Sequence, residues 1–429
     1  MMVACCGPDI NLGTTGTPFG SQEALFFLKK CNNFKQLKEI HSRIIRFGLT
    51  HHQSLSRKLL KLSSSLSQLN HAALLFHQLN DPHTPTWNVM LRLYSLSDSP
   101  QHALILFNAM LSHGFAPDKF TYTFVINACR ASSALGFGKM AHALAIKTRF
   151  WRDLYVQNTM MNLYFDFQNV DDGRKVFDKM LVRNVFSWNI AIGGLVEVSK
   201  LDAARELFEE MPPKNVVSWT AVIDGCVKHK QPVEAFKYFE RMLVDSVRPN
   251  EYTVVSLIRA CSEMGSLKLG RCIHHFALKN GLQLRPFLGT ALIDMYSKCG
   301  SLDDARRVFG MMHVRTLATW NTMITSLGVH GLWNEALALF EEMEKAKQVP
   351  DAITFVGVLS ACIHKKNLEQ GQRYFNLMTN RYGITPIVEH YKCMDELHTR
   401  ANKLDETCTL GNKRALTMIL VFFYFGLKY

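Results

Sequence analysis

Tryptophan residues recur at fixed distances along this chain of 429 residues, and this regularity limits the fold more than any other feature. Four of the six tryptophans stand in closely similar sequence settings, at positions 87, 188, 219 and 320. They are 101, 31 and 101 residues apart, and 101 divides into two steps of 35 and one of 31. The grid gives the segments 84–118, 119–153, 154–184, 185–215, 216–250, 251–285, 286–316 and 317–351. Periods of roughly 20 to 50 residues predict an array of structural repeats.

Within one segment, apolar residues follow the period of an amphipathic helix twice. In 317–351 the spacing i, i+3, i+4, i+7 occurs first at Trp320, Met323, Ile324 and Leu327 and then at Ala336, Leu339, Phe340 and Met343. Gly328 and Gly331 lie between the two stripes, and Pro350 and Asp351 end the segment. Proline cannot continue a helix and aspartate can cap the next one. Each segment is therefore predicted to be a helical hairpin.

The second helix of the hairpin repeats a small residue, a phenylalanine and a methionine. The sets are Ala103, Phe107 and Met110; Ala204, Phe208 and Met211; Ala235, Phe239 and Met242; Ala305, Phe309 and Met312; and Ala336, Phe340 and Met343. A small residue allows two helices to approach, and the larger side chains fill the space between hairpins, so these positions are predicted to be core rather than ligand-binding. Because one hairpin cannot cover its own apolar face, we predict an all-α fold, a right-handed α-solenoid superhelix of stacked helix-turn-helix repeats with a concave side.

Composition favours one continuous body without a membrane span. Hydrophobic residues make up 48% of the chain, and the 25 glycines and 13 prolines are thinly scattered. Mean hydropathy is −0.02, which argues against both disorder and a multispanning membrane protein. The formal net charge of +13 favours an anionic partner such as nucleic acid, although a basic surface without a ligand is equally compatible with charge alone.

The eleven cysteines do not predict a metal site. No CxxC pair occurs, and Cys5 and Cys6 are adjacent, which suits neither a metal site nor a disulfide. Cys129, Cys261 and Cys362 instead recur at spacings of 132 and 101 residues. They are predicted to be small buried side chains at one repeat position, in a reducing compartment.

The segments resemble the pentatricopeptide repeat, which begins with valine, threonine, tyrosine and asparagine and ends with proline and aspartate over 35 residues. Segments 84–118, 216–250 and 317–351 are similar to standard repeats, 119–153, 251–285 and 352–387 to the long variant, and the 31-residue segments to the short variant. This mixture resembles the plant subclass that combines standard, long and short repeats, and tells against the tetratricopeptide scaffold with its strict 34-residue period.

The long-repeat signature is seen three times. It runs from Gly270 to His274 and on through Lys279 to Gly281, from Gly138 to His142 and on through Lys147, and from Leu37 to His41 and on through Arg46 to Gly48. With a first long repeat near 18–52 and a short one near 53–83, the array is expected to cover 21–406, with a partial repeat at 388–406. Residues 1–20 are expected to be a leader or a disordered terminus, and 407–429 a divergent apolar tail.

The resemblance implies binding of single-stranded organellar RNA, with one base assigned to each repeat and contacted by its fifth and last residues. On the grid these pairs are Asn88 with Asp118, Thr123 with Asp153, Asn158 with Asn184, Asn189 with Asn215, Thr220 with Asn250, and Asn321 with Asp351. The pairs Val255 with Arg285, Thr290 with Thr316, and Arg57 with His83 fit no pairing preference of the family. The preferences imply the target 5′ U, G, pyrimidine, pyrimidine, A, any, any, U 3′ along 84–351. The alternative is that the aspartates and asparagines are simply turn or N-cap residues.

A basic residue also recurs in the long repeats, 28 places after each repeat begins, as Arg46, Lys147 and Lys279. If this position faces the concave side, these residues could contact phosphates. A solvated charged surface is the alternative.

No catalytic constellation and no cofactor site are predicted. The chain has no phosphate-binding glycine loop, no HExxH, and neither the HxE nor the PCxxC signature of the zinc deaminase that many relatives in the subclass carry. We therefore expect a non-enzymatic RNA-binding protein, with any editing deaminase or other processing factor supplied in trans. RNA stabilisation, splicing and translation are alternatives to editing, and a scaffold for protein–protein interaction is the alternative function.

The two ends carry the remaining signals. Residues 415–427 form an apolar run of 13, shorter than the roughly 20 residues that span a bilayer, so a cover for the end of the solenoid or a truncated gene product is favoured over a tail anchor. Residues 1–20 contain no lysine or arginine, and Thr14, Thr15 and Thr17 fit a plastid leader better than a mitochondrial one. Chloroplast location is expected, with the mitochondrion as the alternative, chiefly from the resemblance.

Overall fold

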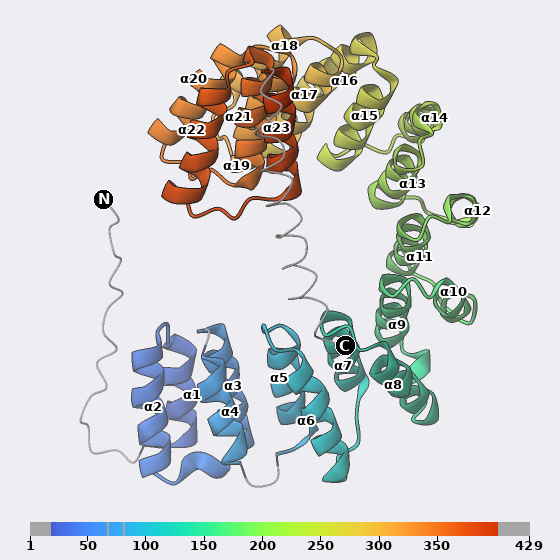
Figure 1. The fold of residues 1–429 in the computed structure, drawn as a ribbon. Helices are drawn as coiled ribbons and strands as arrows, with labels where there is room; N and C mark the ends of the chain where they lie inside the picture. Colours follow the sequence, from blue (N-terminus) through green and yellow to red (C-terminus); the bar gives the residue numbers. More distant parts are fainter. Residues whose placement is uncertain (1–18, 67, 80–81, 402–429) are drawn as a thin grey trace. The chain divides into compact units, whose positions relative to one another are not determined.

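The computed structural model describes residues 19–66, 68–79 and 82–401, and all regular structure in these ranges is helical (Figure 1). The all-α helical-repeat solenoid predicted from the sequence is confirmed. Nearly all of the predicted N-terminal leader and the whole apolar tail at 407–429 lie outside the described residues. The final part of the partial repeat, 402–406, lies outside them as well.

Contacts divide the chain into two compact units, with the division between Lys214 and Asn215. The first unit contains α1 (Ser21–Lys30), α2 (Phe34–Arg46), α3 (Gln53–Ser65), α4 (Leu69–His77), α5 (Thr84–Ser95), α6 (Gln101–Ser112), α7 (Lys119–Ala131), α8 (Leu135–Lys147), α9 (Leu154–Asp166), α10 (Val170–Asp178), α11 (Val185–Glu197) and α12 (Leu201–Glu210), with short 3₁₀ turns η1 (Leu49–His51) and η2 (Phe150–Arg152). The second contains α13 (Val216–Lys228), α14 (Pro232–Val244), α15 (Glu251–Met264), α16 (Leu267–Lys279), α17 (Pro286–Lys298), α18 (Leu302–Met311), α19 (Leu317–Val329), α20 (Trp333–Lys345), α21 (Ala352–Lys365), α22 (Leu368–Asn376), the π-turn η3 (Leu377–Arg381) and α23 (Val388–Arg400).

The helix starts coincide with the 35- and 31-residue grid. Every odd-numbered helix from α5 to α21 begins at the first residue of a segment, and α23 begins at residue 388. The reason is local, because the residue before each of these helices is the last residue of a segment and has the extended backbone of an N-cap. The spacing of cap residues therefore sets the spacing of the hairpins.

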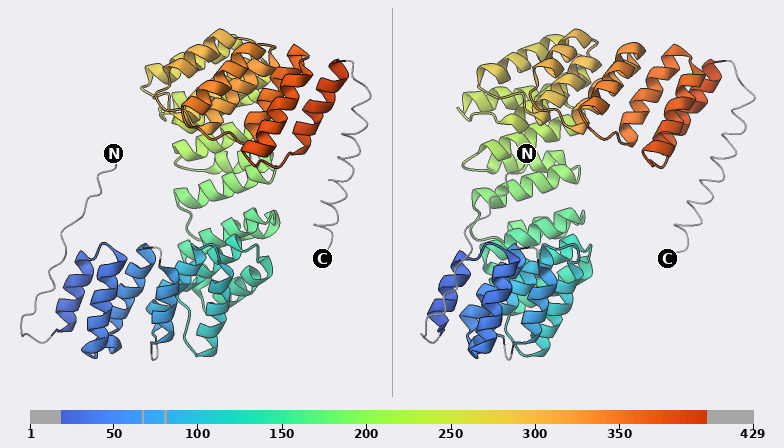
Figure 2. Two further views of the ribbon diagram at one scale, coloured as in Figure 1. Left: turned by 60° about the vertical axis from the view of Figure 1, so that its left-hand side comes forward. Right: turned by 90° about the vertical axis from the view of Figure 1, so that its left-hand side faces the viewer.

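Within each unit, the first helix of a repeat contacts the first helix of the next (Figures 1 and 2). These contacts join α5, α7, α9 and α11 in the first unit and the odd-numbered helices from α13 to α23 in the second. The second helix packs against its own first helix and against the first helix that follows. The alanine, phenylalanine and methionine triplets are all buried at these junctions, as predicted. Their burial between neighbouring hairpins is what makes stacking favourable.

The tryptophan spacing has a packing explanation. Trp87, Trp188 and Trp320 each stand edge-on to a phenylalanine from the preceding short repeat, with ring centroids 4.8, 4.9 and 5.1 Å apart. At the last two junctions an arginine, Arg183 or Arg315, lies over both rings. A tryptophan therefore marks the repeat that follows a short one, because the ring fills the space behind its phenylalanine.

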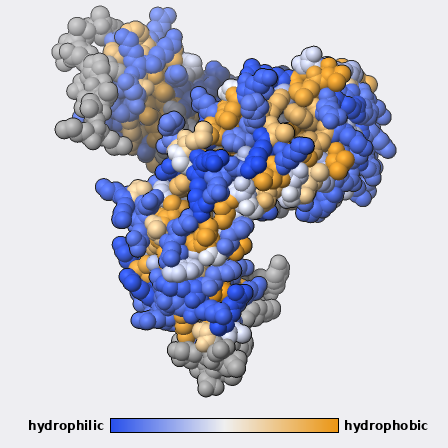
Figure 3. Space-filling view, turned by 90° about the horizontal axis from the view of Figure 1, so that it is seen from above, coloured by the Kyte–Doolittle hydropathy of each residue, from blue (hydrophilic) through white to orange (hydrophobic). Residues whose placement is uncertain are grey.

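The recurring cysteines are core residues. Cys129, Cys261 and Cys362 are fully buried, and burial raises the pKa of each thiol to about 12. They therefore remain protonated at neutral pH and serve as small apolar side chains. Among the described residues, no helix is long and apolar enough to cross a bilayer. Hydrophilic side chains dominate the face drawn in Figure 3, with apolar patches between them.

Candidate nucleic-acid interface

The last residue of most repeats is the N-cap of the next first helix. The side-chain oxygens of Asp118, Asn250 and Asp351 each accept a hydrogen bond of 2.9 Å from the backbone N–H of the third residue of the following repeat. Asp153 caps α9 and Asn184 caps α11 in similar ways. These residues therefore cap helices, which is the alternative role that the sequence allowed. A capping aspartate still has further lone pairs on its carboxylate that can accept from another partner.

Two of the predicted pairs are in direct contact. The Asn88 amide nitrogen donates to both carboxylate oxygens of Asp118, at 2.9 and 3.0 Å. The Asn321 amide nitrogen donates to Asp351 Oδ1 at 2.9 Å. Both asparagines are buried. In each contact the two residues are 30 positions apart in the sequence. Stacking of consecutive first helices therefore places the fifth and last residues together.

The other predicted pairs differ in their surroundings. Thr220 contacts the hydroxyl of Thr253, which in turn bonds Asn250. The Thr123 hydroxyl donates to the Lys119 carbonyl at 2.8 Å. Asn158 is 4% exposed and its Oδ1 has no hydrogen-bond partner within the described chain. The pair Asn189 and Asn215 falls in different units, with Asn189 on α11 and Asn215 capping α13.

Three neighbouring pockets form a groove along the first helices of the second unit. The pocket of about 390 Å³ is lined by Thr220 and Asn250, the next of about 430 Å³ by Thr290 and Thr316, and the third of about 900 Å³ by Asn321 and Asp351. The first two share Val255, Arg259 and Phe287, and the last two share Asp294, Ala318 and Thr322, so the pockets are continuous. The groove is lined by the fifth and last residues of successive repeats.

The second residue of each repeat is a feature that the sequence analysis missed. Seven of these residues are large, apolar and between 44% and 70% exposed: Phe120, Tyr155, Phe186, Val217, Tyr252, Phe287 and Ile353. Each stands three places before a fifth residue, and four of them line the groove pockets. Exposed aromatic and aliphatic side chains at regular intervals provide surfaces on which bases can stack. Their constant place in the repeat could be seen in the sequence. Their exposure could not, because an apolar residue at the start of a helix is ordinarily expected to be buried in the core.

The three residues predicted to contact phosphates lie at the ends of second helices. Arg46, Lys147 and Lys279 are exposed, and each is the final residue of a second helix, α2, α8 or α16. A cation at this place also stabilises the carboxyl end of a helix through its dipole. Lys279, the one of the three that belongs to the second unit, is not among the residues that line the three groove pockets described above.

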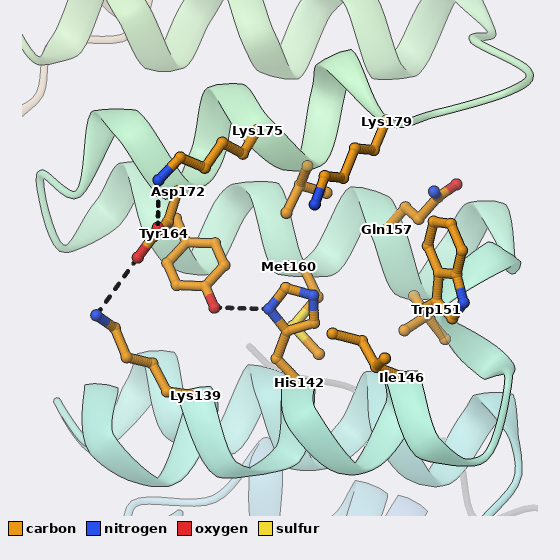
Figure 4. A pocket seen from close by; sticks show the side chains of 12 residues that line it. Lys139, His142, Ile146, Trp151, Gln157, Met160, Tyr164, Asp172, Lys175 and Lys179 are labelled. Atoms are coloured by element: carbon orange, nitrogen blue, oxygen red, sulfur yellow. Dashed lines mark hydrogen bonds and ion pairs between the residues drawn. The ribbon is translucent and has the colours of Figure 1, made fainter.

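A further cavity of about 350 Å³ lies between α8, α9 and α10, and none of the residues predicted to contact bases is among those that line it (Figure 4). His142 Nδ1 is 2.7 Å from the Tyr164 hydroxyl, and Asp172 pairs with Lys139 at 3.4 Å. Burial lowers the pKa of His142 and raises that of Tyr164 to about 12, so both are neutral at pH 7. His274 and Tyr296 repeat the contact at 2.9 Å in the second unit. These pairs join the second helix of a long repeat to the next repeat.

The fold and groove together define a helical-repeat protein of the α-solenoid class. The chain matches the PPR repeat family over residues 82–130, 214–263 and 315–364, and the PPR repeat over 158–185, 186–212 and 290–316. It is 54% identical over 395 residues to the Arabidopsis thaliana pentatricopeptide repeat-containing protein At3g26630, chloroplastic, covering 92% of this chain and 87% of the relative. The chain belongs to the pentatricopeptide repeat family.

Two other comparisons concern a more distant relative and a solved structure. At1g06140 of Arabidopsis thaliana, named as mitochondrial, is 30% identical over 386 residues, covering 89% of this chain and 64% of that protein. The crystal structure of the pentatricopeptide repeat protein PPR10 from maize has the same fold. Its TM-score is 0.56 at 18% identity, covering 91% of this chain and 66% of that one.

Proposed function

We propose that this protein binds single-stranded RNA in a plant organelle through the groove formed by its first helices, and that each standard repeat selects one base. The observation that carries the proposal is the contact between fifth and last residues, Asn88 with Asp118 and Asn321 with Asp351, at the position where a base edge would be met. The exposed apolar row at the second residue and the net charge of +13 support it, since the first suits stacking and the second suits phosphates.

We also propose a subclass, a mode of action and a compartment for this protein. The chain belongs to the subclass with mixed standard, long and short repeats and works without chemistry of its own, with a processing factor such as a deaminase acting on the bound RNA in trans. The name of the 54% identical relative favours the chloroplast, and that of the 30% identical one keeps the mitochondrion as the alternative. A fluorescent fusion of the full chain in leaf cells tests the compartment, and proteins that co-purify from that compartment in an RNA-dependent manner test the partner.

Binding is tested with labelled RNA that contains 5′ UGCCANNU 3′, compared with a scrambled RNA of the same composition at fixed salt. We expect tighter binding of the designed sequence and a log–log salt slope of about −0.7 per phosphate contacted. The double variant Asn321→Ala with Asp351→Ala should lose affinity for the final uracil by on the order of 1 to 3 kcal/mol. Equal affinity for both RNAs contradicts the base assignment, and the absence of RNA binding favours a protein scaffold.

A further inference from the structure

We propose that each selective repeat uses a third residue, the hydroxyl side chain at the third position of the following repeat, to fix which hydrogen-bonding group the fifth residue presents. The inference rests on the proposed function and deepens it. It is drawn from Thr121, Thr253 and Thr354, which contact the fifth residue of the repeat before them.

The geometry is the same in both repeats that pair asparagine with aspartate. Thr121 Oγ1 lies 2.7 Å from Asn88 Oδ1, and Thr354 Oγ1 lies 2.6 Å from Asn321 Oδ1. Both hydroxyls are buried, and both also accept a hydrogen bond from the backbone N–H of the capping aspartate, at 3.0 Å. Each hydroxyl oxygen also lies within donating distance of that carboxylate, 3.0 and 2.9 Å from Oδ1, but its contact with the asparagine is shorter.

These contacts leave one orientation of the asparagine amide. With Asn321 Oδ1 accepting from Thr354, its nitrogen donates to Asp351. Turning the amide over would place its oxygen 2.9 Å from the carboxylate, where two acceptors repel each other. The amide oxygen is engaged by the threonine, so the remaining N–H is the group available to a base. A donor suits the O4 acceptor of uracil and opposes the N4 amino group of cytosine.

The short repeat 154–184 provides the contrast inside the same molecule. The third residue of the next repeat is Ser187, and its hydroxyl donates to the cap residue Asn184 at 2.9 Å. Asn158 is as buried as Asn321, yet its Oδ1 has no hydrogen-bond partner among the described residues. No threonine of the described chain holds this amide in one orientation, which matches a repeat that accepts both pyrimidines.

In the repeat 216–250, which pairs Thr220 with Asn250, the third residue of the following repeat is Thr253, and it acts on the direction of a hydroxyl proton. Thr253 Oγ1 donates to Asn250 Oδ1 at 3.0 Å and lies 2.7 Å from Thr220 Oγ1. Either threonine can be the donor in this pair; when the Thr253 proton goes to Asn250, Thr220 donates to Thr253 and its lone pairs are left for the groove. An acceptor at this point suits the N6 amino group of adenine and opposes the O6 of guanine.

Long repeats lack this third residue. The corresponding positions after 119–153 and 251–285 are Val156 and Leu288, both buried and without a hydroxyl. The inference therefore predicts weaker base selection by the long repeats than by the standard ones.

The test measures dissociation constants of the full chain for RNAs that differ only at one nucleotide. Thr354→Val keeps the shape of the side chain and removes the hydroxyl. We expect the preference for uracil over cytosine at the final nucleotide to fall about five- to ten-fold, with preferences at the other positions unchanged. Thr253→Val should similarly reduce the preference for adenine over guanine at the fifth nucleotide.

The control is Thr86→Val. Thr86 has the same place in its helix and is equally buried, but its hydroxyl donates to Gln53 rather than to a base-contacting residue. Any general effect of losing a hydroxyl should appear in this variant, which should keep every base preference. The reverse substitution, Ser187→Thr, should give uracil an advantage over cytosine at the third nucleotide, and it covers the case in which Thr354→Val does not fold.

The outcomes separate the two proposals. If the unaltered protein binds the designed RNA selectively but Thr354→Val keeps its uracil preference and Ser187→Thr gains none, the third residue has only a capping role and the inference is wrong. If the unaltered protein binds no RNA, the proposed function itself fails. A fall in affinity for uracil and cytosine alike in Thr354→Val, with their ratio unchanged, also overturns the inference.

Discussion

At the scale of single residues, the last residue of a standard repeat serves the fold and the groove with one side chain. Asp351 accepts a hydrogen bond from the backbone N–H of Thr354 in the first turn of α21, and it also holds the amide of Asn321. Capping is worth about 1 kcal/mol and does not require a charge, since asparagine and aspartate cap equally well. Orienting a neighbouring amide does depend on the carboxylate, because only an ionised acid accepts without donating. The two roles can therefore be separated by a single substitution.

Asp351→Asn is the substitution that separates them. The cap is retained, so the melting temperature should stay close to that of the unaltered protein. The uracil preference at the final nucleotide should fall by on the order of 1 kcal/mol, because the new amide can donate as well as accept and no longer holds Asn321 in one orientation. Thermal melting by circular dichroism and binding to RNAs with uracil or cytosine at that place measure the two effects. Asp351→Ala is the companion variant, and it should lose both stability and selectivity.

At the scale of helices, α19 and α21 of the second unit approach each other closely at two glycines. A methyl group added at Gly328 would stand 2.8 Å from the Gly357 carbonyl oxygen and 3.3 Å from the Ala361 nitrogen, both backbone atoms. A methyl group at Gly357 would stand 2.8 Å from Thr325 Oγ1. Backbone cannot rotate away as a side chain can, so the two glycines set the distance between these helices. The spacing matters to the groove, since Asn321 is on α19 and its partner Asp351 caps α21.

Gly328→Ala should therefore destabilise the second unit by about 1 to 3 kcal/mol, despite the better helix propensity of alanine. Gly193→Ala is the matched control. Gly193 lies inside α11, where an added methyl group would meet no atom within 4 Å, and the same change should stabilise by about 0.5 to 1 kcal/mol. Melting curves of the two variants should shift in opposite directions. A parallel shift would show that α19 and α21 adjust to the methyl group without cost.

The sequence predicted the repeats more completely than it predicted the contacts of the groove. Repeat boundaries were accessible because Trp87, Trp188 and Trp320 follow short repeats at fixed intervals and fill one kind of space. The fifth and last residues could be named from their place in the repeat. The contact of Thr354 with Asn321 could not, because it joins residues 33 apart and depends on the rotation of one hydroxyl. Nor did the sequence show that the Ser187 hydroxyl bonds the cap residue Asn184 whereas the Thr354 hydroxyl bonds Asn321.

At the scale of the whole molecule, stability should depend on pH through histidines buried at repeat junctions. Burial lowers the pKa of His41, His142, His274 and His390 below the ordinary value. A second influence has the same direction, because the chain already carries a net charge of +13 with its 17 histidines neutral, and protonation adds to the repulsion. The first influence belongs to particular contacts, and the second to the molecule as a whole.

The sign follows from proton binding. A histidine whose folded pKa lies below its unfolded value of about 6.5 takes up fewer protons in the folded state, so its stabilising contribution is complete above that pH and is lost as the pH falls below it. The melting temperature should therefore decrease from pH 7.5 to pH 5.5. The double variant His142→Gln with His274→Gln should show a smaller decrease, whereas the exposed His313→Gln should behave as the unaltered chain. Added salt distinguishes the two influences, because it screens surface repulsion and has little effect on burial. The pH dependence is due to net charge, and not to the junction histidines, if two results are found together. High salt would abolish the decrease in melting temperature, and the double variant would show the full decrease at low salt.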